Sequence, residues 1–497
     1  MKNYTKLAVK GVTTVFILTM LAAFLGYIVR VLLAKYLSME EFGLFYAVFS
    51  FLGLWGIFKN LGFDKALIKF IPELQHEEKN DLIKSSIIYV SIVQLITNTI
   101  FIVLIYLLSN YLSVHFFHST QASIVLKLMA IAFFIDGFVF ILKFSFQGFQ
   151  KMMLFAGIEV IRMSLIIAIV FIGLVLNYGI LSPVIAYIFA PVILLLVFTP
   201  ILTKIVFPEF SKSKFILNKI LFKKLSKYSF FVMTTGMGSM IFGYTDSTVL
   251  TYFTSLKDVA LYNIAFPTAN LLIYFPRAIN GILVPLTAEL WAKKKNALLK
   301  AGMESLFKYS IIIIVPLAFM MFSFTDSLII AFFGKDYILA SNAMRILIPG
   351  FIFGTLNGIC MYFFSGIGKP EINSKILFIA ATFNFITNLI LIPIFGILGA
   401  ALTTALSYVI MVVMSLKEIR RFINIKFPVK IWIKTFIAGL LFIFIIWFLK
   451  KAIFLNVWAE TAIVIVISGI SYMVLLFLLK IVDINELKDL YRRIITE

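Results

Sequence analysis

The sequence has too few charged residues and cysteines for a water-soluble or disulfide-bonded protein. Charged residues make up 13% of the 497 residues, hydrophobic residues make up 62%, and the mean hydropathy is +1.06. A soluble domain has roughly 25% charged residues, so the solvent of most of this chain must be lipid. The single cysteine, Cys360, excludes a disulfide framework and a cysteine-ligated metal cluster. Three histidines, two of them His115 and His118, are too few to indicate a metal centre.

A cleaved signal peptide is also missing from the start of the chain. The first apolar stretch, residues 11–34, has no small-residue cleavage site after it and is long enough to cross a membrane. A span needs about 20 mostly apolar residues, and fourteen stretches qualify. The expected spans are residues 11–34, 42–58, 85–108, 122–146, 152–176, 180–202, 228–253, 258–287, 306–333, 340–366, 373–394, 396–416, 429–449 and 457–479.

Lysine and arginine are distributed unevenly between the loops that this span count defines. Alternate loops and the two ends carry 32 of the 44 basic residues, and the opposite loops carry five. Under the positive-inside rule, both termini are cytoplasmic in a multi-pass protein of the cell membrane. The net charge of +21 is then explained by topology and contact with anionic lipid, so we expect no nucleic-acid partner.

Four short patterns occur twice along the chain, 216 to 218 residues apart. The pairs are AKYLSMEEFGLFYAVF (34–49) with TYFTSLKDVALYNIAF (251–266), FSFQGFQK (144–151) with YFFSGIGK (362–369), PEL (72–74) with AEL (288–290), and Gly-Ile-Leu at 179–181 with 396–398. Six spans separate the copies, so both run in the same direction, as in transporters built from parallel repeats. The small residues Gly396, Gly399, Ala400 and Ala401 should let the helices approach closely at the last corner.

We therefore predict an all-α integral membrane protein with 14 transmembrane helices. It would contain two pseudo-symmetric six-helix lobes plus two C-terminal helices. The predicted divisions are an N-lobe at 1–202, a Lys-rich cytoplasmic linker at 203–227, a C-lobe at 228–422, and the last two spans with a cytoplasmic tail at 423–497.

Arginines inside spans are costly, about 2.5–3.5 kcal/mol or more each, and need a reason. We expect Arg30 and Arg277, from corresponding parts of the two lobes, to face a central cavity, where their guanidinium groups could bind a diphosphate. Alternatively, Arg30 reaches the membrane surface, and Arg277 pairs with a carboxylate. Prolines around Arg277 predict a bent span. Glu159 and Arg162 are three residues apart, which predicts a structural ion pair.

Asp246 is the acid most likely to serve function, because it lies deep in a span with no basic residue within ten positions. Asn384 and Asn388 are four residues apart and share one helix face, and Thr404 lies on the next span. A carboxylate, two amides and a hydroxyl form an all-oxygen set that suits a hard cation. The alternative is that the two asparagines only join helices. For Asp136, Lys143 and Asp326, structural pairing is favoured over a proton relay.

Three motifs resemble those of polysaccharide flippases of the Wzx type, in the superfamily that includes MATE exporters and the lipid II flippase. They are LLAKYLSMEEFGLFYAVFSFLG, DSTVLTYFTSLKDVALYNIAF and NLILIPIFGILGAALTTALSY. The resemblance implies two lobes around a cavity and transfer of polyprenyl-linked oligosaccharide to the outer leaflet by alternating access. It also implies arginines on spans 1 and 8, and a Na+ site at Asp246, Asn384, Asn388 and Thr404 with the Ala400 carbonyl. Relatives can have an acid at the position of Asn388, so Na+ affinity here should be lower.

Three other functions fit the sequence less well than a flippase. A multidrug antiporter needs an acidic, aromatic cavity, and a glycan polymerase or glycosyltransferase needs a catalytic outer domain, which the short loop at 109–121 does not offer. A scaffold of a glycan-assembly complex is a further alternative. We expect a transporter rather than an enzyme, no cofactor apart from a bound Na+, and as partners the lipid-linked oligosaccharide, membrane lipids and glycan-assembly enzymes.

Overall fold

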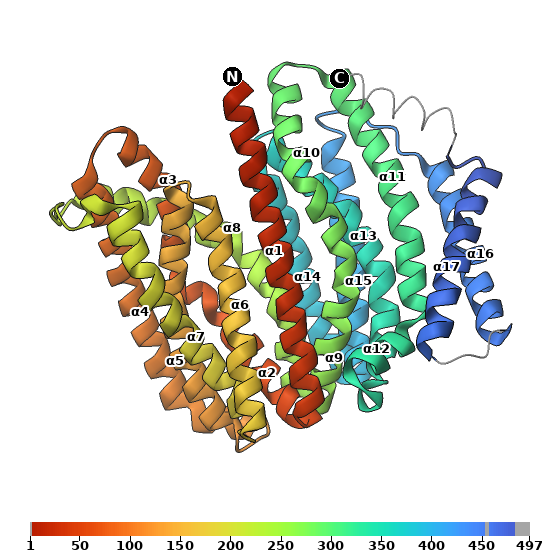
Figure 1. The fold of residues 1–497 in the computed structure, drawn as a ribbon, viewed down its shortest axis with the longest axis horizontal. Coiled ribbons are helices and arrows are strands. Elements are labelled where there is room, and N and C mark those ends of the chain that lie inside the picture. The colour runs from red at the N-terminus through yellow and green to blue at the C-terminus, as the bar shows by residue number, and fades with distance from the viewer. Residues whose placement is uncertain (1, 453–456, 483–497) are drawn as a thin grey trace. The chain divides into compact units, whose positions relative to one another are not determined.

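The computed structural model describes residues 2–452 and 457–482, and these residues form helices and turns without a strand (Figure 1). The α-helices are α1 Lys2–Tyr36, α2 Met39–Asn60, α3 Phe63–His76, α4 Asn80–His115, α5 Ala122–Gly148, α6 Met152–Val175, α7 Leu181–Pro200, α8 Lys219–Phe253, α9 Leu256–Ala269, α10 Tyr274–Ala292, α11 Asn296–Ser323, α12 Thr325–Phe333, α13 Ala340–Gly366, α14 Pro370–Phe395, α15 Ile397–Ile419, α16 Val429–Ala452 and α17 Val457–Leu478. Short turns are η1 Ile201–Val206, η2 Pro208–Phe210, η3 Asn270–Ile273 and η4 Lys335–Tyr337. The all-helical membrane class is confirmed.

The sequence repeat is visible in where helices begin. The first residues of α1 and α8, α2 and α9, α4 and α11, α5 and α13, α6 and α14, and α7 and α15 are each 216 to 218 positions apart. The same capping motif precedes α2 and α9. The Glu41 amide donates to Ser38 Oγ at 3.2 Å, and the Ser38 amide donates to the Glu41 carboxylate at 3.1 Å. Ser255 and Asp258 form the equivalent pair of bonds, both 3.2 Å. Each capping box satisfies free backbone amides at its helix start.

Ten helices of the described chain are long and apolar enough to cross a membrane. The other four predicted spans also lie on helices, namely α2, α8, the α9–α10 segment and α17. The span predicted at 258–287 is interrupted by the 3₁₀ turn η3, which follows Pro267. A proline removes one helical hydrogen bond and crowds the preceding turn, so the predicted bend is confirmed. The count of fourteen stays a prediction.

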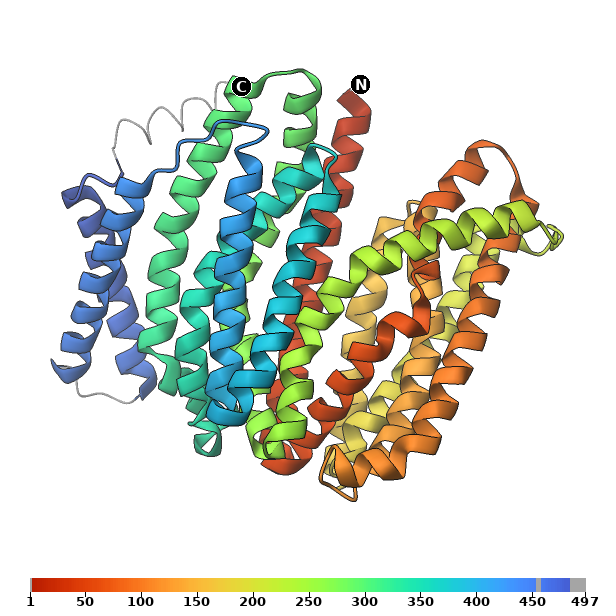
Figure 2. The same cartoon turned by 180° about the vertical axis from the view of Figure 1, so that it is seen from behind.

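The chain divides into two compact units, the first made of residues 1–264 and 377–403 and the second of residues 265–376 and 404–497. In the first unit, α1 packs on α6, α7 packs on α5 and α6, and α4 packs on α5 (Figures 1 and 2). The helix α3 crosses α4, α5 and α8 over a core that includes Phe146 and Leu67. In the second unit, α11 packs on α13 and α16, and α17 packs on α16. The predicted six-helix lobes remain a proposal.

The corner between α14 and α15 is as tight as its small residues predict. Gly396 has φ 54°, a left-handed conformation that glycine adopts without steric cost. A Cβ atom at Gly399 would lie 2.3 Å from the Leu391 carbonyl oxygen. Ala400 and Ala401 are fully buried. This corner brings the start of α15 against the end of α14, where two of the predicted site residues lie.

Candidate functional site

The helix α8 places Asp246 in a buried run of small polar residues. The residue is 5% exposed, and its neighbours from Thr245 to Thr251 are buried as well. The hydroxyls of Thr248 and Thr251 each donate to the carbonyl oxygen four residues earlier at 2.7 Å. These local bonds satisfy the two threonines within the helix. Asp246 therefore contributes the one carboxylate to a stretch, residues 245–251, that is otherwise neutral.

The carboxylate of Asp246 accepts hydrogen bonds from two other helices of the first compact unit. The Tyr262 hydroxyl on α9 donates to Oδ2. Asn388 on α14 donates from Nδ2 to Oδ1 at 2.6 Å, although 142 residues separate the two positions. The same Nδ2 lies 3.0 Å from the Asn384 Oδ1 atom, one helical turn away. Asp246, Asn384 and Asn388 are thus in one cluster, as the sequence predicts.

The start of α15 completes this cluster through Thr403. Its hydroxyl donates to Asn388 Oδ1 and lies 2.9 Å from the Ala400 carbonyl oxygen. The prediction named Thr404, which is also buried. Thr404 belongs to the second compact unit, so its part in the site stays a prediction. The hydrogen bond to Asn388 comes from Thr403, whose side chain points about 100° away from that of Thr404 because the two are successive helical residues.

The Asn388 amide can serve two arrangements of the cluster. In the structure it turns its Nδ2 donor toward Asp246 and its oxygen toward Thr403. A half-turn of the amide would place its oxygen beside those of Asp246 and Asn384, while Thr403 would accept from the nitrogen. A hydroxyl can both donate and accept, so Thr403 tolerates either orientation. Three oxygens about 3 Å apart repel unless a cation lies between them, and such a set suits a hard cation.

Arg30 is connected to this cluster through α9. Its guanidinium donates to the Asn263 carbonyl oxygen and lies 4.3 Å from the ring centre of Tyr46, a cation–π distance. The side-chain Nδ2 of Asn263 in turn donates to Ser247 Oγ at 3.0 Å, and Ser247 directly follows Asp246. The repeat distance of 217 residues pairs Arg30 with Ser247, so the expected correspondence of Arg30 with Arg277 is wrong.

Arg277 lies in the first turn of α10, in the second compact unit. Its side chain is exposed, and its guanidinium carbon is 4.8 Å from the ring centre of Tyr274. Among the described residues, no carboxylate lies within ion-pair distance of it. The alternative in which Arg277 pairs with a carboxylate therefore gains no support, and the group is available to a ligand.

A second buried group of charges joins α2, α5 and α6. Arg162 lies 3.3 Å from Asp136 and 3.4 Å from Glu159, and Lys143 lies 2.9 Å from Glu159. Lys59, 4% exposed, donates to the Phe133 carbonyl oxygen at 2.5 Å. The predicted Glu159–Arg162 pair is confirmed, and it belongs to a larger network. Asp326 pairs with Arg345 at 2.6 Å.

Sequence reasoning missed Tyr262, Thr403 and Lys59. Tyr262 looks like an ordinary core tyrosine, since nothing in its local pattern marks its hydroxyl. Lys59 directly follows the span expected at 42–58, so the sequence places it in a loop, although it lies one residue inside the end of α2. Lys59 directly follows an apolar run, which indicates that the helix extends through Lys59.

Comparison with known proteins identifies the family of this chain. The family model described as "Polysaccharide biosynthesis protein" matches residues 8–291, and the MatE model matches 233–390. An uncharacterized membrane protein of Methanocaldococcus jannaschii is 36% identical over 99% of both chains. The "Probable low-salt glycan biosynthesis flippase Agl15" of Haloferax volcanii is 25% identical over 44% of this chain and 47% of its own.

Solved structures show the same fold. The lipid II flippase MurJ in an inward closed conformation superposes with a TM-score of 0.74 at 19% identity, covering 92% of this chain and 97% of that one. An inward-facing MATE transporter of the MOP superfamily gives a TM-score of 0.68 at 14% identity, covering 82% and 98%. The chain therefore belongs to the polysaccharide biosynthesis protein family and has the fold of MOP-superfamily transporters.

Proposed function

We propose that this protein is a flippase that moves a lipid-linked oligosaccharide from the cytoplasmic to the outer leaflet by alternating access. Its family is that of polysaccharide biosynthesis proteins, and two of its relatives are described as flippases, one of lipid II and one in glycan biosynthesis. The family and the fold favour a transporter over an enzyme. The carrier would be a polyprenyl phosphate or diphosphate.

The Asp246 cluster is the observation that supports coupling to an ion gradient. Its carboxylate joins α8, α9 and α14, and Asn388 links the start of α15 to it through Thr403. A Na+ ion held by Asp246, Asn384 and Asn388, with Thr404 and the Ala400 carbonyl as further ligands, would replace the amide and phenol donors. Binding would then change which helices Asp246 holds together. A proton on Asp246 is the alternative coupling ion, with the membrane potential as a further driving force.

Two arginines would bind the anionic end of the carrier lipid. A guanidinium group binds phosphate oxygens with paired hydrogen bonds, which a lysine ammonium cannot reproduce. Arg277 is exposed, so it can reach a phosphate without breaking an internal ion pair. Arg30 is held by a single backbone carbonyl and a ring face. Its bond to Asn263 would be exchanged for one to the substrate.

Lysine placement supports the proposed orientation in the cell membrane. The residues between α7 and the buried part of α8 include seven exposed lysines, at positions 204, 212, 214, 219, 223, 224 and 227. Loops this basic remain on the cytoplasmic side, so both termini would be cytoplasmic. Glycan-assembly enzymes on that side are the partners that would supply the substrate.

A multidrug antiporter is the second candidate. The MatE family model matches residues 233–390, and this stretch includes Asp246, Asn384 and Asn388. A cation exporter would use such a carboxylate to bind its drug or its coupling ion. The available cation at Arg277 favours an anionic substrate instead, because like charges repel a cationic drug.

The test uses purified protein in liposomes with an imposed Na+ gradient. A polyprenyl-diphosphate oligosaccharide labelled in its sugar is added, and a probe that cannot cross the membrane reports its arrival on the far leaflet. Wild type and the control Asp336→Asn, whose side chain is exposed, should flip the lipid when the gradient is present. Asp246→Asn should insert normally and lose the Na+ dependence.

Each other outcome has a definite meaning. Unchanged Na+ stimulation in Asp246→Asn would remove the cation from this cluster. Efflux of a cationic dye without flipping of any glycan lipid would replace the flippase by the antiporter.

A further inference from the structure

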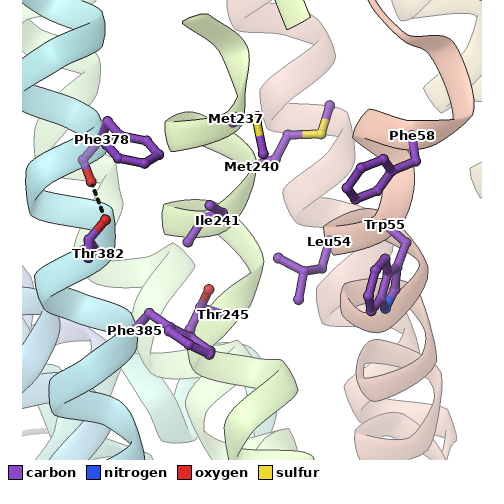
Figure 3. A pocket seen from close by; sticks show the side chains of 10 residues that line it. All are labelled: Leu54, Trp55, Phe58, Met237, Met240, Ile241, Thr245, Phe378, Thr382 and Phe385. Atoms are coloured by element: carbon purple, nitrogen blue, oxygen red, sulfur yellow. Dashed lines mark hydrogen bonds between the residues drawn. The ribbon is translucent and has the colours of Figure 1, made fainter. Parts of the chain in front are cut away.

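An apolar pocket of about 270 Å³ lies between α2, α8 and α14 in the first compact unit (Figure 3). The helix α2 supplies Trp55 and Phe58, and α14 supplies Phe378 and Phe385. These four aromatic side chains are 42% to 49% exposed, so the pocket is open to the surface of the unit. The helix α14 is long and apolar enough to span a membrane, so this wall of the pocket belongs to a candidate membrane-spanning segment.

One polar atom in this pocket has no partner. The Thr245 hydroxyl is buried, with the residue 1% exposed, and it makes no hydrogen bond in the structure. Figure 3 shows it pointing into the space that Leu54, Ile241 and Phe385 surround. The Thr382 hydroxyl, by contrast, donates to the Phe378 carbonyl oxygen at 3.0 Å. A buried donor left unpaired costs about 1–3 kcal/mol, so Thr245 requires an explanation.

The helix itself offers this hydroxyl a partner that it does not use. Thr248 and Thr251, on the same helix, return their hydroxyls to carbonyl oxygens four residues earlier. Thr245 instead turns its hydroxyl away from its own backbone. A water molecule is a poor occupant, because it needs two to four polar partners. Apart from Thr245 and Thr382, whose hydroxyl already donates to Phe378, the walls of this pocket are mainly aromatic rings, aliphatic groups and thioethers.

We propose that the pocket binds the isoprenoid chain of the carrier lipid. An isoprenoid has a methyl branch and a carbon–carbon double bond in each unit, and the π electrons of that bond accept a weak hydrogen bond from a hydroxyl. A saturated acyl chain gives Thr245 no acceptor. Met237 and Met240 also line the pocket, and their flexible, polarizable side chains adapt to branched and unsaturated chains. From residue 237 to 245 the wall is roughly 12 Å long, which suits a short stretch of such a chain.

The pocket shares two helices with the Asp246 cluster. Thr245 directly precedes Asp246 on α8, and Phe385 directly follows Asn384 on α14. A chain between these helices would set their separation on one side, while the cation cluster sets it on the other. The inference rests on the proposed function, since it assigns the lipid part of the same substrate.

The experiment is photolabelling of the full-length protein in nanodiscs of saturated phospholipid. The probe is a polyprenyl phosphate with a diazirine in its chain, and labelled peptides are mapped by mass spectrometry. We expect labelling within 237–245 and 378–385. Unsaturated polyprenyl phosphate should compete roughly two- to fivefold better than its fully hydrogenated analogue, the ratio expected for one weak hydrogen bond. Thr245→Val should remove that preference while labelling persists.

The second variant fills the pocket with a larger side chain. Ile241→Trp should lower labelling by roughly tenfold or more because the indole occupies the space. Ile390→Trp on α14 is the matched control, because Ile390 is 56% exposed and lies outside the pocket. Labelling that survives Ile241→Trp, or equal competition by the hydrogenated analogue in wild type, overturns the inference.

The same experiment separates the two proposals because it requires no transport. Pocket labelling in a protein that flips no glycan lipid would refute the proposed function and leave the chain site standing. Normal flipping by Ile241→Trp, with no labelling of the pocket in wild type, would refute the chain site alone.

Discussion

Replacing Asn388 by aspartate should strengthen the proposed Na+ site. The Asn388 Nδ2 atom lies 2.6 Å from Asp246 Oδ1, so the new carboxylate faces an existing one. Two unit charges 4 Å apart interact by about 4 kcal/mol at an effective dielectric constant of 20. Without a cation this repulsion opposes folding, and with a cation between them both carboxylates attract it.

The net gain is smaller than the Coulomb term because the new carboxylate must be desolvated. We expect Na+ to bind roughly ten- to a hundredfold more tightly, which corresponds to about 1.4–2.7 kcal/mol. The Asn388→Asp variant should unfold at a lower temperature than wild type in choline chloride. When Na+ replaces choline, the unfolding temperature of the variant should rise by more than that of wild type. A ligand that binds only the folded state stabilises it, and the stabilisation grows with the ratio of ligand concentration to Kd.

The assay is thermal unfolding of the purified protein across a Na+ titration, with K+ and choline as reference cations. Asn357→Asp is the matched control, because Asn357 is equally buried but lies on α13, where Ser415 donates to its oxygen at 2.8 Å. It should lose stability in every salt alike. Equal responses to Na+ in wild type and Asn388→Asp would refute the reasoning, since the added charge would then lie outside any cation site.

Three further predictions test the corner, the arginine and the buried ion network. Gly399→Ala should lower the free energy of unfolding by about 1–3 kcal/mol, because its Cβ would meet the Leu391 carbonyl oxygen; thermal melts measure this. Arg277→Ala should abolish flipping, whereas Arg277→Lys should retain part of it, in the liposome assay. Asp136→Asn should lower the free energy of unfolding by about 1–3 kcal/mol, because Arg162 loses one charged acceptor and keeps Glu159; denaturation in detergent measures it.

Each of these changes has a control on the same chain. Gly236→Ala places a Cβ in open space on α8 and should not lower stability as Gly399→Ala does. Asp326→Asn breaks a pair whose aspartate is 51% exposed, and exposed pairs contribute about 1 kcal/mol or less. Full flipping by Arg277→Ala would remove that residue from the substrate path.

Much of the fold could be predicted because helix formation in a membrane is dictated locally. Every backbone donor and acceptor in lipid must be satisfied within the segment, so a long apolar run has little choice but to form a helix. The capping boxes at Ser38 and Ser255 likewise mark helix starts with local chemistry. The break in the α9–α10 segment followed from Pro267. What could not be derived is how many helices cross the membrane, since α8 mixes apolar and polar stretches and η3 interrupts the α9–α10 segment.

The candidate site could be predicted only in part because its contacts are long-range. Helical spacing placed Asn384 and Asn388 on one face, but 142 residues separate Asn388 from Asp246. The family resemblance, not local pattern, joined them. The Thr403 hydroxyl, which donates to Asn388, was not among the predicted ligands, because nothing in the sequence distinguishes it from the adjacent Thr404.

Comparison of the two repeats explains why the cluster is built once rather than twice. At the repeat distance, Asp246 and Tyr262 correspond to Val29 and Phe45, which are 3% and 0% exposed. In place of the bonded carboxylate and phenol, the first copy has two packed apolar side chains. A valine and a phenylalanine contribute no oxygen ligand, so this part of the first repeat cannot hold a cation in the same way.

The pair formed by the next position on each of these two helices differs between the repeats in charge. Ser247 and Asn263, joined by a 3.0 Å hydrogen bond, correspond to Arg30 and Tyr46, joined by a cation–π contact. One repeat therefore has an anionic centre on its first two helices, and the other has a cationic centre at the same place. The Arg30 bond to the Asn263 carbonyl connects the two. A cation that moves α9 by changing Asp246 must also move the carbonyl that holds Arg30, which is how ion binding at one centre would release a guanidinium for the substrate at the other.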